Sequence, residues 1–316
     1  MEEQRRREEF LKTQEGFRRN AFKIITKMVD WCNRTQGSKH LVDEILHSIF
    51  FLGKINKVPY SPESIIDDEE MITNLQEKYP QPFECYLTQL PRRSPFSCVM
   101  DMVVKQEKQE NENHIKESLT NLINSLEENF LVSSTICVSQ KSNNSVRYYG
   151  VSMSTTGPNA GNIVIAASCF SAWDNYVADA VMTYYPEKGQ KGKEHKKKSY
   201  FDGTIKLPES VVCKAYSLSN GDEIPPCKSC GNLFGFPTDQ KKEWPYGHCA
   251  EAESLSNLLK NEQEVKRETK QGSDTCKPEN RKKARESVLD KLRAVLSTIQ
   301  FNKWSQQNGQ FYNPQS

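Results

Sequence analysis

The chain has 316 residues, enough for one large or two modest domains with a core that can enclose a pocket. Its 43 Lys and Arg nearly balance its 41 Asp and Glu, and the formal net charge of +2 excludes a protein that coats nucleic acid with its whole surface. The apolar content of 36% is low for a globular chain, which predicts that part of the sequence is solvated tail or linker.

The N-terminal stretch MEEQRRREEFLKTQEG mixes charges of both signs and lacks the apolar segment of a signal peptide. No later run approaches the roughly 20 apolar residues that span a bilayer. We therefore expect an intracellular protein, cytoplasmic or nuclear, with no membrane contact. In that setting the ten cysteines are thiols or metal ligands rather than disulfides. Those that stand alone among apolar neighbours are expected to be small core residues: Cys32, Cys85, Cys98, Cys137, Cys169 and Cys213.

The first third of the chain has a helical pattern. Apolar residues recur every three or four positions over residues 10–51, which predicts two amphipathic helices. Repeated prolines make residues 52–100 irregular, with one helix expected in DDEEMITNLQEKY at 67–79. The polar run KQEKQENENH at 105–114 predicts a domain boundary. Residues 1–105 are therefore interpreted as a helical N-terminal region, through which a protein partner could bind.

Strand signals begin after residue 128, where β-branched and aromatic residues alternate with turn formers. The expected fold class is α/β: a helical N-terminal region, then a mixed sheet with helices, then a C-terminal helix. Three segments predict a meander, namely FLVSSTICVS at 130–139, VRYYGVSMS at 146–154 and NIVIAASCF at 162–170. Two more predict further strands, namely AVMTYY at 180–185 and VVCKAYSLS at 211–219.

The same patterns divide the rest of the chain. Residues 115–265 are expected to form the domain that holds the sheet, and the polar residues 266–280 a linker. Apolar positions on one helical face predict a C-terminal helix over 281–300. Residues 303–316, which end in SQQNGQFYNPQS, are predicted to be a disordered tail.

Two cysteine motifs carry most of the chemistry in this sequence. In PPCKSCGNLFG, Cys227 and Cys230 place two thiolates on one turn, within reach of one zinc ion. In GHCAEAESLSNLL, Cys249 adds a third thiolate, and three protein ligands with one open position are typical of a catalytic zinc site. If Cys249 begins a helix, Glu251 lies half a turn further on. A carboxylate there can take a proton from water without becoming a ligand.

Together, Cys249-Ala250-Glu251 and Pro226-Cys227-x-x-Cys230 resemble the zinc-dependent cytidine deaminase-like superfamily. The resemblance implies that Cys227, Cys230 and Cys249 hold Zn²⁺ and that Glu251 is the catalytic proton shuttle. It also implies hydrolytic deamination of a nucleobase, either free, as a nucleoside or within single-stranded nucleic acid. It covers roughly residues 130–265. In the family the Ala-Glu motif precedes the cysteine pair, whereas here the order is reversed, which implies a rearranged fold.

A second interpretation of the same residues stays open. His248 is an alternative ligand to Cys249, and His248 or Cys276 could close a four-ligand structural zinc site of ribbon or treble-clef type. Glu251 would then be an ordinary carboxylate at a helix N-terminus. On that interpretation the protein is a zinc-stabilised interaction module without catalytic activity, or a decayed deaminase.

Two weaker features bear on nucleic acid. The run KGQKGKEHKKK at 188–198 concentrates lysines that either follow a phosphate backbone or form a plain solvated connection. Trp244 and Tyr246 flank the cysteine motifs and are either stacking faces for a base or core residues.

Overall fold

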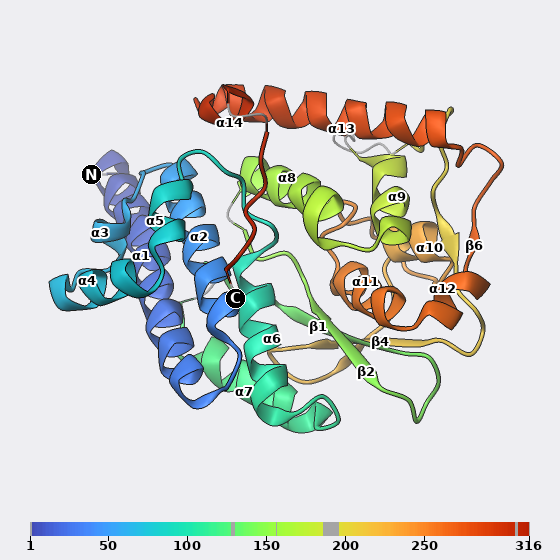
Figure 1. Cartoon of the computed structure of the whole chain (residues 1–316), viewed down its shortest axis with the longest axis horizontal. Coiled ribbons are helices and arrows are strands. Elements are labelled where there is room, and N and C mark those ends of the chain that lie inside the picture. Colours follow the sequence, from blue (N-terminus) through green and yellow to red (C-terminus); the bar gives the residue numbers. More distant parts are fainter. Residues whose placement is uncertain (1, 128–129, 156, 186–195, 307–308, 316) are drawn as a thin grey trace.

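The computed structural model describes residues 2–127, 130–155, 157–185, 196–306 and 309–315. It confirms the mixed α/β class: an N-terminal group of helices lies beside a four-stranded sheet that carries further helices (Figure 1). Most of the lysine run at 188–198 falls outside the described residues. No helix of the described ranges has the length and apolarity to cross a membrane.

Seven helices make up the N-terminal part of the described chain. They are α1 (Glu2–Arg34), α2 (Lys39–Ile55), α3 (Pro62–Ile65), α4 (Glu69–Lys78), α5 (Pro80–Cys85), α6 (Pro95–Glu107) and α7 (Glu112–Asn124). The predicted helices correspond to α1, α2 and α4. The expectation of an otherwise irregular segment over 52–100 was wrong, because Pro62, Pro80 and Pro95 begin helices rather than break them. The first helical position needs no N–H donor, so proline fits there.

The main sheet has the strand order β2-β1-β4-β5, and every pairing in it is antiparallel. Its strands are β1 (Thr135–Gln140), β2 (Arg147–Val151), β4 (Val212–Ser217) and β5 (Glu223–Ile224). A separate two-stranded sheet pairs β3 (Ile205–Lys206) with β6 (Lys270–Gln271). The mixed strand orientation expected from the sequence is therefore not observed among the described strands.

Two predicted strands are helices. Residues 162–170 belong to α8 (Gly157–Ala167) and to the π-helical turn η1 (Ser168–Ala172). AVMTYY forms the end of α9 (Asn175–Tyr184), with its last tyrosine as the C-cap. The residues from Ile163 to Ala167 are all buried, so they show neither the alternation of a half-exposed strand nor the polar face of a surface helix. A short apolar run of this kind does not distinguish the two structures. The Asp174 side chain accepts a hydrogen bond from the Tyr176 N–H at 2.9 Å and caps α9.

The two cysteine motifs begin α10 (Lys228–Phe234) and α11 (Ala250–Asn261), and α12 (Gln263–Glu268) follows. Helix α11 packs across β1 and β2. Gly150 of β2 permits this close approach: a Cβ there would lie 2.2 Å from the Ser254 nitrogen and 2.5 Å from the Ala250 oxygen. The first turns of α11 therefore rest directly on the backbone of β2.

The C-terminal segment makes tertiary contacts where it is described, and the disordered tail over 303–316 stays a prediction. Helix α13 (Pro278–Thr298) packs on α8 and α9, and α14 (Lys303–Gln306) follows it. The chain then runs back to α2 (Figure 1), where the Tyr312 hydroxyl donates a hydrogen bond to Asp43 and its ring stacks on His47 at 3.9 Å. Trp304 and Tyr312 are each 2% exposed, so aromatic burial holds a segment of polar composition in place.

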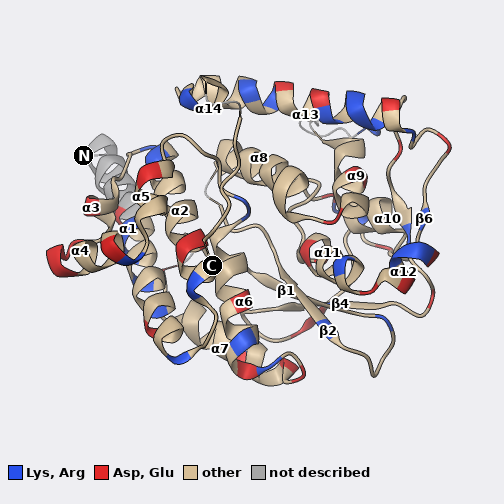
Figure 2. Cartoon of the chain, in the orientation of Figure 1, with Lys and Arg blue, Asp and Glu red and all other residues tan. Residues whose placement is uncertain are grey.

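The predicted domain ranges stay a prediction. Buried residues of the helical region and of the sheet form one contiguous apolar core. In the view of Figure 2, acidic and basic residues are interspersed along the helices, as the near-zero net charge leads us to expect.

Candidate metal centre and pocket

The three motif cysteines converge where α10 and α11 begin. Cys227 is the N-cap of α10, Cys249 is the N-cap of α11, and Cys230 lies in the first turn of α10. The Cys227 sulfur is 3.6 Å from that of Cys230 and 3.5 Å from that of Cys249. In a tetrahedral site with Zn–S bonds of about 2.3 Å, the sulfurs are separated by about 3.8 Å. The donor set and its spacing therefore fit a zinc ion.

The protonation of the cluster is uneven. Contacts with the Cys230 and Cys249 thiols, followed by the N–H groups of Cys230 and Ser229, lower the pKa of Cys227 to about 2. The contact with Cys227 raises the pKa values of Cys230 and Cys249 well above the ordinary range. Cys227 is therefore the cysteine of the cluster that most readily becomes a thiolate. A dication would displace the remaining thiol protons, because thiolates are the metal ligands.

Glu251 lies in the first turn of α11 and is 6% exposed. Burial raises the pKa of its carboxyl above the usual value, and the nearby Cys227 adds to the effect. Among the described residues, the three cysteine sulfurs form a group of possible metal-ligand atoms that all lie within 4.8 Å of one another. The Glu251 carboxylate is not part of this group. Glu251 therefore stands beside the metal centre without completing it.

A cavity of about 300 Å³ opens at this point, and its wall includes Cys227, Cys249 and Glu251. The wall also includes hydroxyl-bearing residues at the ends of β1 and β2 and several apolar residues. The remaining lining residues are Ser134, Thr135, Ser152, Met153, Ala215, Ile224, Pro225, Trp244, His248 and Ala250. Within the described chain this lining contains no Lys or Arg. The volume is at the small end of the range for ligand pockets, which suits one small ring system.

The loop between the motifs is held in a defined path. The Ser229 hydroxyl donates to the Trp244 carbonyl at 2.6 Å, and the Lys228 N–H donates to the Lys242 carbonyl at 3.1 Å. Gly247 has a φ of +89°, and a Cβ there would lie 3.1 to 3.2 Å from Ile165, Trp173 and Val181. This position combines left-handed backbone with close packing, so glycine is required to bring Cys249 to the cluster.

The alternative ligands do not join the cluster. His248 is one of the residues that line the cavity, but it is not among the donors that lie together. Burial lowers its pKa to about 4, which keeps the ring neutral at pH 7. The Cys276 sulfur lies elsewhere and accepts a hydrogen bond from Arg281 at 3.4 Å. Within the described residues, therefore, neither His248 nor Cys276 closes a four-ligand structural site.

The two flanking aromatics have different surroundings. Trp244 is 46% exposed and forms part of the cavity wall. Tyr246 is 5% exposed and stacks on Tyr184 at 4.0 Å, so it is a core residue. The hydroxyls of Ser134, Thr135 and Ser152 were not predicted as site residues, because only the pairing of β1 with β2 brings them to the cavity.

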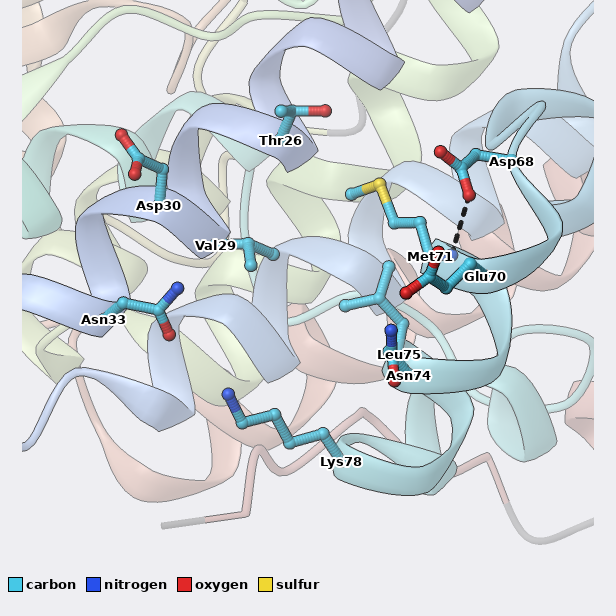
Figure 3. Close-up of a pocket in the computed structure, with 10 residues that line it drawn as sticks. All are labelled: Thr26, Val29, Asp30, Asn33, Asp68, Glu70, Met71, Asn74, Leu75 and Lys78. Atoms are coloured by element: carbon cyan, nitrogen blue, oxygen red, sulfur yellow. Dashed lines mark hydrogen bonds between the residues drawn. The ribbon is translucent and has the colours of Figure 1, made fainter.

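Another hollow, of about 400 Å³, lies between α1 and α4, and Figure 3 shows the residues that line it. Two of its three carboxylates have structural partners: Asp30 pairs with Arg34 at 2.6 Å, and Asp68 accepts a hydrogen bond from the Met71 N–H at 2.8 Å. It is lined by neither cysteine nor histidine. The smaller cavity beside the sulfurs is therefore the better candidate for chemistry.

No protein-family model matches the chain, and no curated protein or solved structure matches it either. The likeness to deaminases therefore depends on the two motifs and on the site that they build.

Proposed function

We propose that this protein is a zinc-dependent hydrolytic deaminase of a nucleobase, with Cys227, Cys230 and Cys249 as zinc ligands and Glu251 as the catalytic acid and base. One observation carries the proposal: Glu251 borders the same cavity as Cys227 and Cys249, two of the three clustered cysteines, while Glu251 stays outside the ligand set. A purely structural zinc site would require neither the cavity nor the buried carboxylate.

Zinc, when bound, would supply the Lewis acidity that activates a water molecule. Glu251 would accept the proton of that water and deliver it to the departing amino group. In the overall step, a C–O bond forms at the amidine carbon, the C–N bond breaks and ammonia leaves. The buried position of Glu251 suits both halves of the transfer, because a raised pKa makes the carboxylate a stronger base and keeps the proton available for return.

The walls of the cavity support a neutral, planar substrate. The indole of Trp244 offers a partly exposed face for stacking, and Ser134, Thr135 and Ser152 offer hydroxyls for the polar edge of a ring. The Lys242 ammonium lies 3.6 Å from the centre of the Trp244 ring but is not part of the cavity lining. The proposal therefore covers a base that is free, in a nucleoside or in a single strand.

The decisive experiment compares wild type with Glu251→Gln at equal zinc content. Ammonia release is measured from cytidine, adenosine, guanine and single-stranded oligonucleotides. Loss of the proton shuttle should lower the rate by about 10²-fold or more, while zinc content and fold are retained. Glu264→Gln, on α12 outside the cavity lining, is the matched control and should leave the rate unchanged.

Activity that survives Glu251→Gln unchanged would contradict the assigned mechanism. A wild type that holds zinc and releases no ammonia from any of these substrates would favour the zinc-stabilised interaction module instead.

A further inference from the structure

A second buried carboxylate of α11, Glu253, faces the N-terminal helical region. Its Oε1 lies 3.5 Å from Nη1 of Arg93, and its Oε2 accepts a hydrogen bond from the Val151 N–H at 3.0 Å. Only 7% of its side chain is exposed. The two carboxylate oxygens thus join α11 to the last residue of β2 and to Arg93.

Arg93 lies in the segment between α5 and α6, and its guanidinium serves several elements. Its Nε pairs with Glu44 of α2 at 2.8 Å, and its Nη2 pairs with Asp101 of α6 at 2.6 Å. Its side chain is 14% exposed. One guanidinium therefore joins α2, α6 and α11. In such a buried network, removal of one partner leaves another charged group unpaired.

Glu253 contacts the end of β2, and the residues that follow β2 line the cavity beside the metal centre. Val151 precedes Ser152 and Met153, which line the cavity, and the Met153 N–H donates to the His248 carbonyl at 2.9 Å. On α11, Glu253 is two residues from Glu251 and four from Cys249, so the same first turn carries the ligand, the catalytic carboxylate and the anchor. A shift of this turn would move the Cys249 sulfur relative to the two sulfurs on α10.

We propose that Glu253 is a positioning residue, and that through Arg93 the N-terminal helical region forms part of the support of the metal centre. Its effect on the reaction rests on the proposed function, whereas its effect on metal affinity does not. Residues that orient metal ligands from behind affect affinity by about 10–100-fold.

The test compares Glu253→Gln with Glu44→Gln. Each variant removes one carboxylate charge beside Arg93, but only Glu253 lies on α11. Zinc affinity is measured by competition with a chromophoric chelator, and folding is followed by circular dichroism. We expect Glu253→Gln to weaken zinc binding by about 10–100-fold. Glu44→Gln should keep the wild-type affinity even where it lowers the melting temperature.

A second variant, Arg93→Lys, covers the case in which Glu253→Gln fails to fold. It keeps the positive charge but loses the planar fork that reaches three carboxylates, so zinc binding should again weaken. Equal zinc affinity in wild type, Arg93→Lys and Glu253→Gln would overturn the positioning role, as would equal losses in Glu44→Gln and Glu253→Gln. A wild type that binds no zinc would overturn both the positioning role and the proposed function, whereas equal affinities in the variants would overturn the positioning role alone.

Discussion

Two groups of cysteines in this molecule have sulfurs at nearly the same spacing but differ in surroundings. Cys227, Cys230 and Cys249 lie at the starts of two helices, with sulfur distances of 3.5 and 3.6 Å from Cys227. Cys137 and Cys213 lie on the neighbouring strands β1 and β4, with their sulfurs 3.3 Å apart. Short sulfur distances alone therefore do not define a metal centre.

The surroundings decide what each group can do. The first group receives main-chain N–H groups at the start of α10 and borders a cavity, and the pKa of Cys227 is lowered to about 2. In the sheet, the Ser139 hydroxyl donates a hydrogen bond to the Cys213 sulfur at 3.3 Å. Neither Cys137 nor Cys213 lines the cavity. Burial raises the pKa of Cys137 well above the ordinary range. Three features together distinguish the candidate metal centre from the pair in the sheet. They are main-chain N–H groups that stabilise a thiolate, a third cysteine and an adjoining cavity.

The largest expected effect is loss of the metal. Cys227→Ser and Cys249→Ser should each abolish zinc binding and destabilise the surrounding region, because binding free energies for structural zinc of about 10–16 kcal/mol also contribute to folding. Cys213→Ser should keep about one zinc per chain. Native mass spectrometry gives the zinc content and thermal unfolding gives the stability. A metal-free wild type, or a Cys213→Ser variant that loses zinc to the same extent, would remove the distinction between the two groups.

A smaller effect is expected from the contact between α11 and β2. Gly150→Ala would place a methyl group against the backbone of Ser254 and Ala250 and should lower the free energy of unfolding by about 1–3 kcal/mol, with weaker zinc binding. Gly221→Ala is the control: its φ of +76° makes alanine strained, at about 1–2 kcal/mol, but nothing lies within 4 Å of the added methyl. Urea denaturation measures the stability of each variant, and zinc titration measures its metal affinity. Equal zinc affinity in both variants would show that this contact does not support the centre.

The smallest effect is expected at His248. His248 lines the cavity without joining the donor group, so His248→Ala should keep full zinc occupancy and affinity. Zinc titrations of His248→Ala and wild type compare their metal occupancy and affinity. Metal depletion in His248→Ala would identify the ring as a ligand and favour a closed structural site.

Parts of this arrangement could be predicted from the sequence because they depend on local spacing. The Cys227-x-x-Cys230 turn and a helix start at Cys249 need only neighbouring residues, and both are present in the structure. The helices α8 and α9 were mistaken for strands, since segments buried on every side carry no periodic signal.

The remaining features depend on tertiary contacts. Arg93 and Glu253 are 160 positions apart in the sequence. The approach of α11 to Gly150 and the gathering of hydroxyls at the cavity also join separate segments of the chain. The same holds for Trp304 and Tyr312, which are buried although the C-terminal segment has a polar composition. The local sequence pattern around a residue does not indicate which distant residues it contacts.

The central claim is an open zinc centre with three sulfur ligands beside Glu251. X-ray absorption at the zinc edge of the purified protein tests it directly. The account predicts three sulfurs at about 2.3 Å and one oxygen at about 2.0 Å, without the scattering pattern of an imidazole. Four sulfurs, or three sulfurs with an imidazole nitrogen, would show a closed structural site and contradict it.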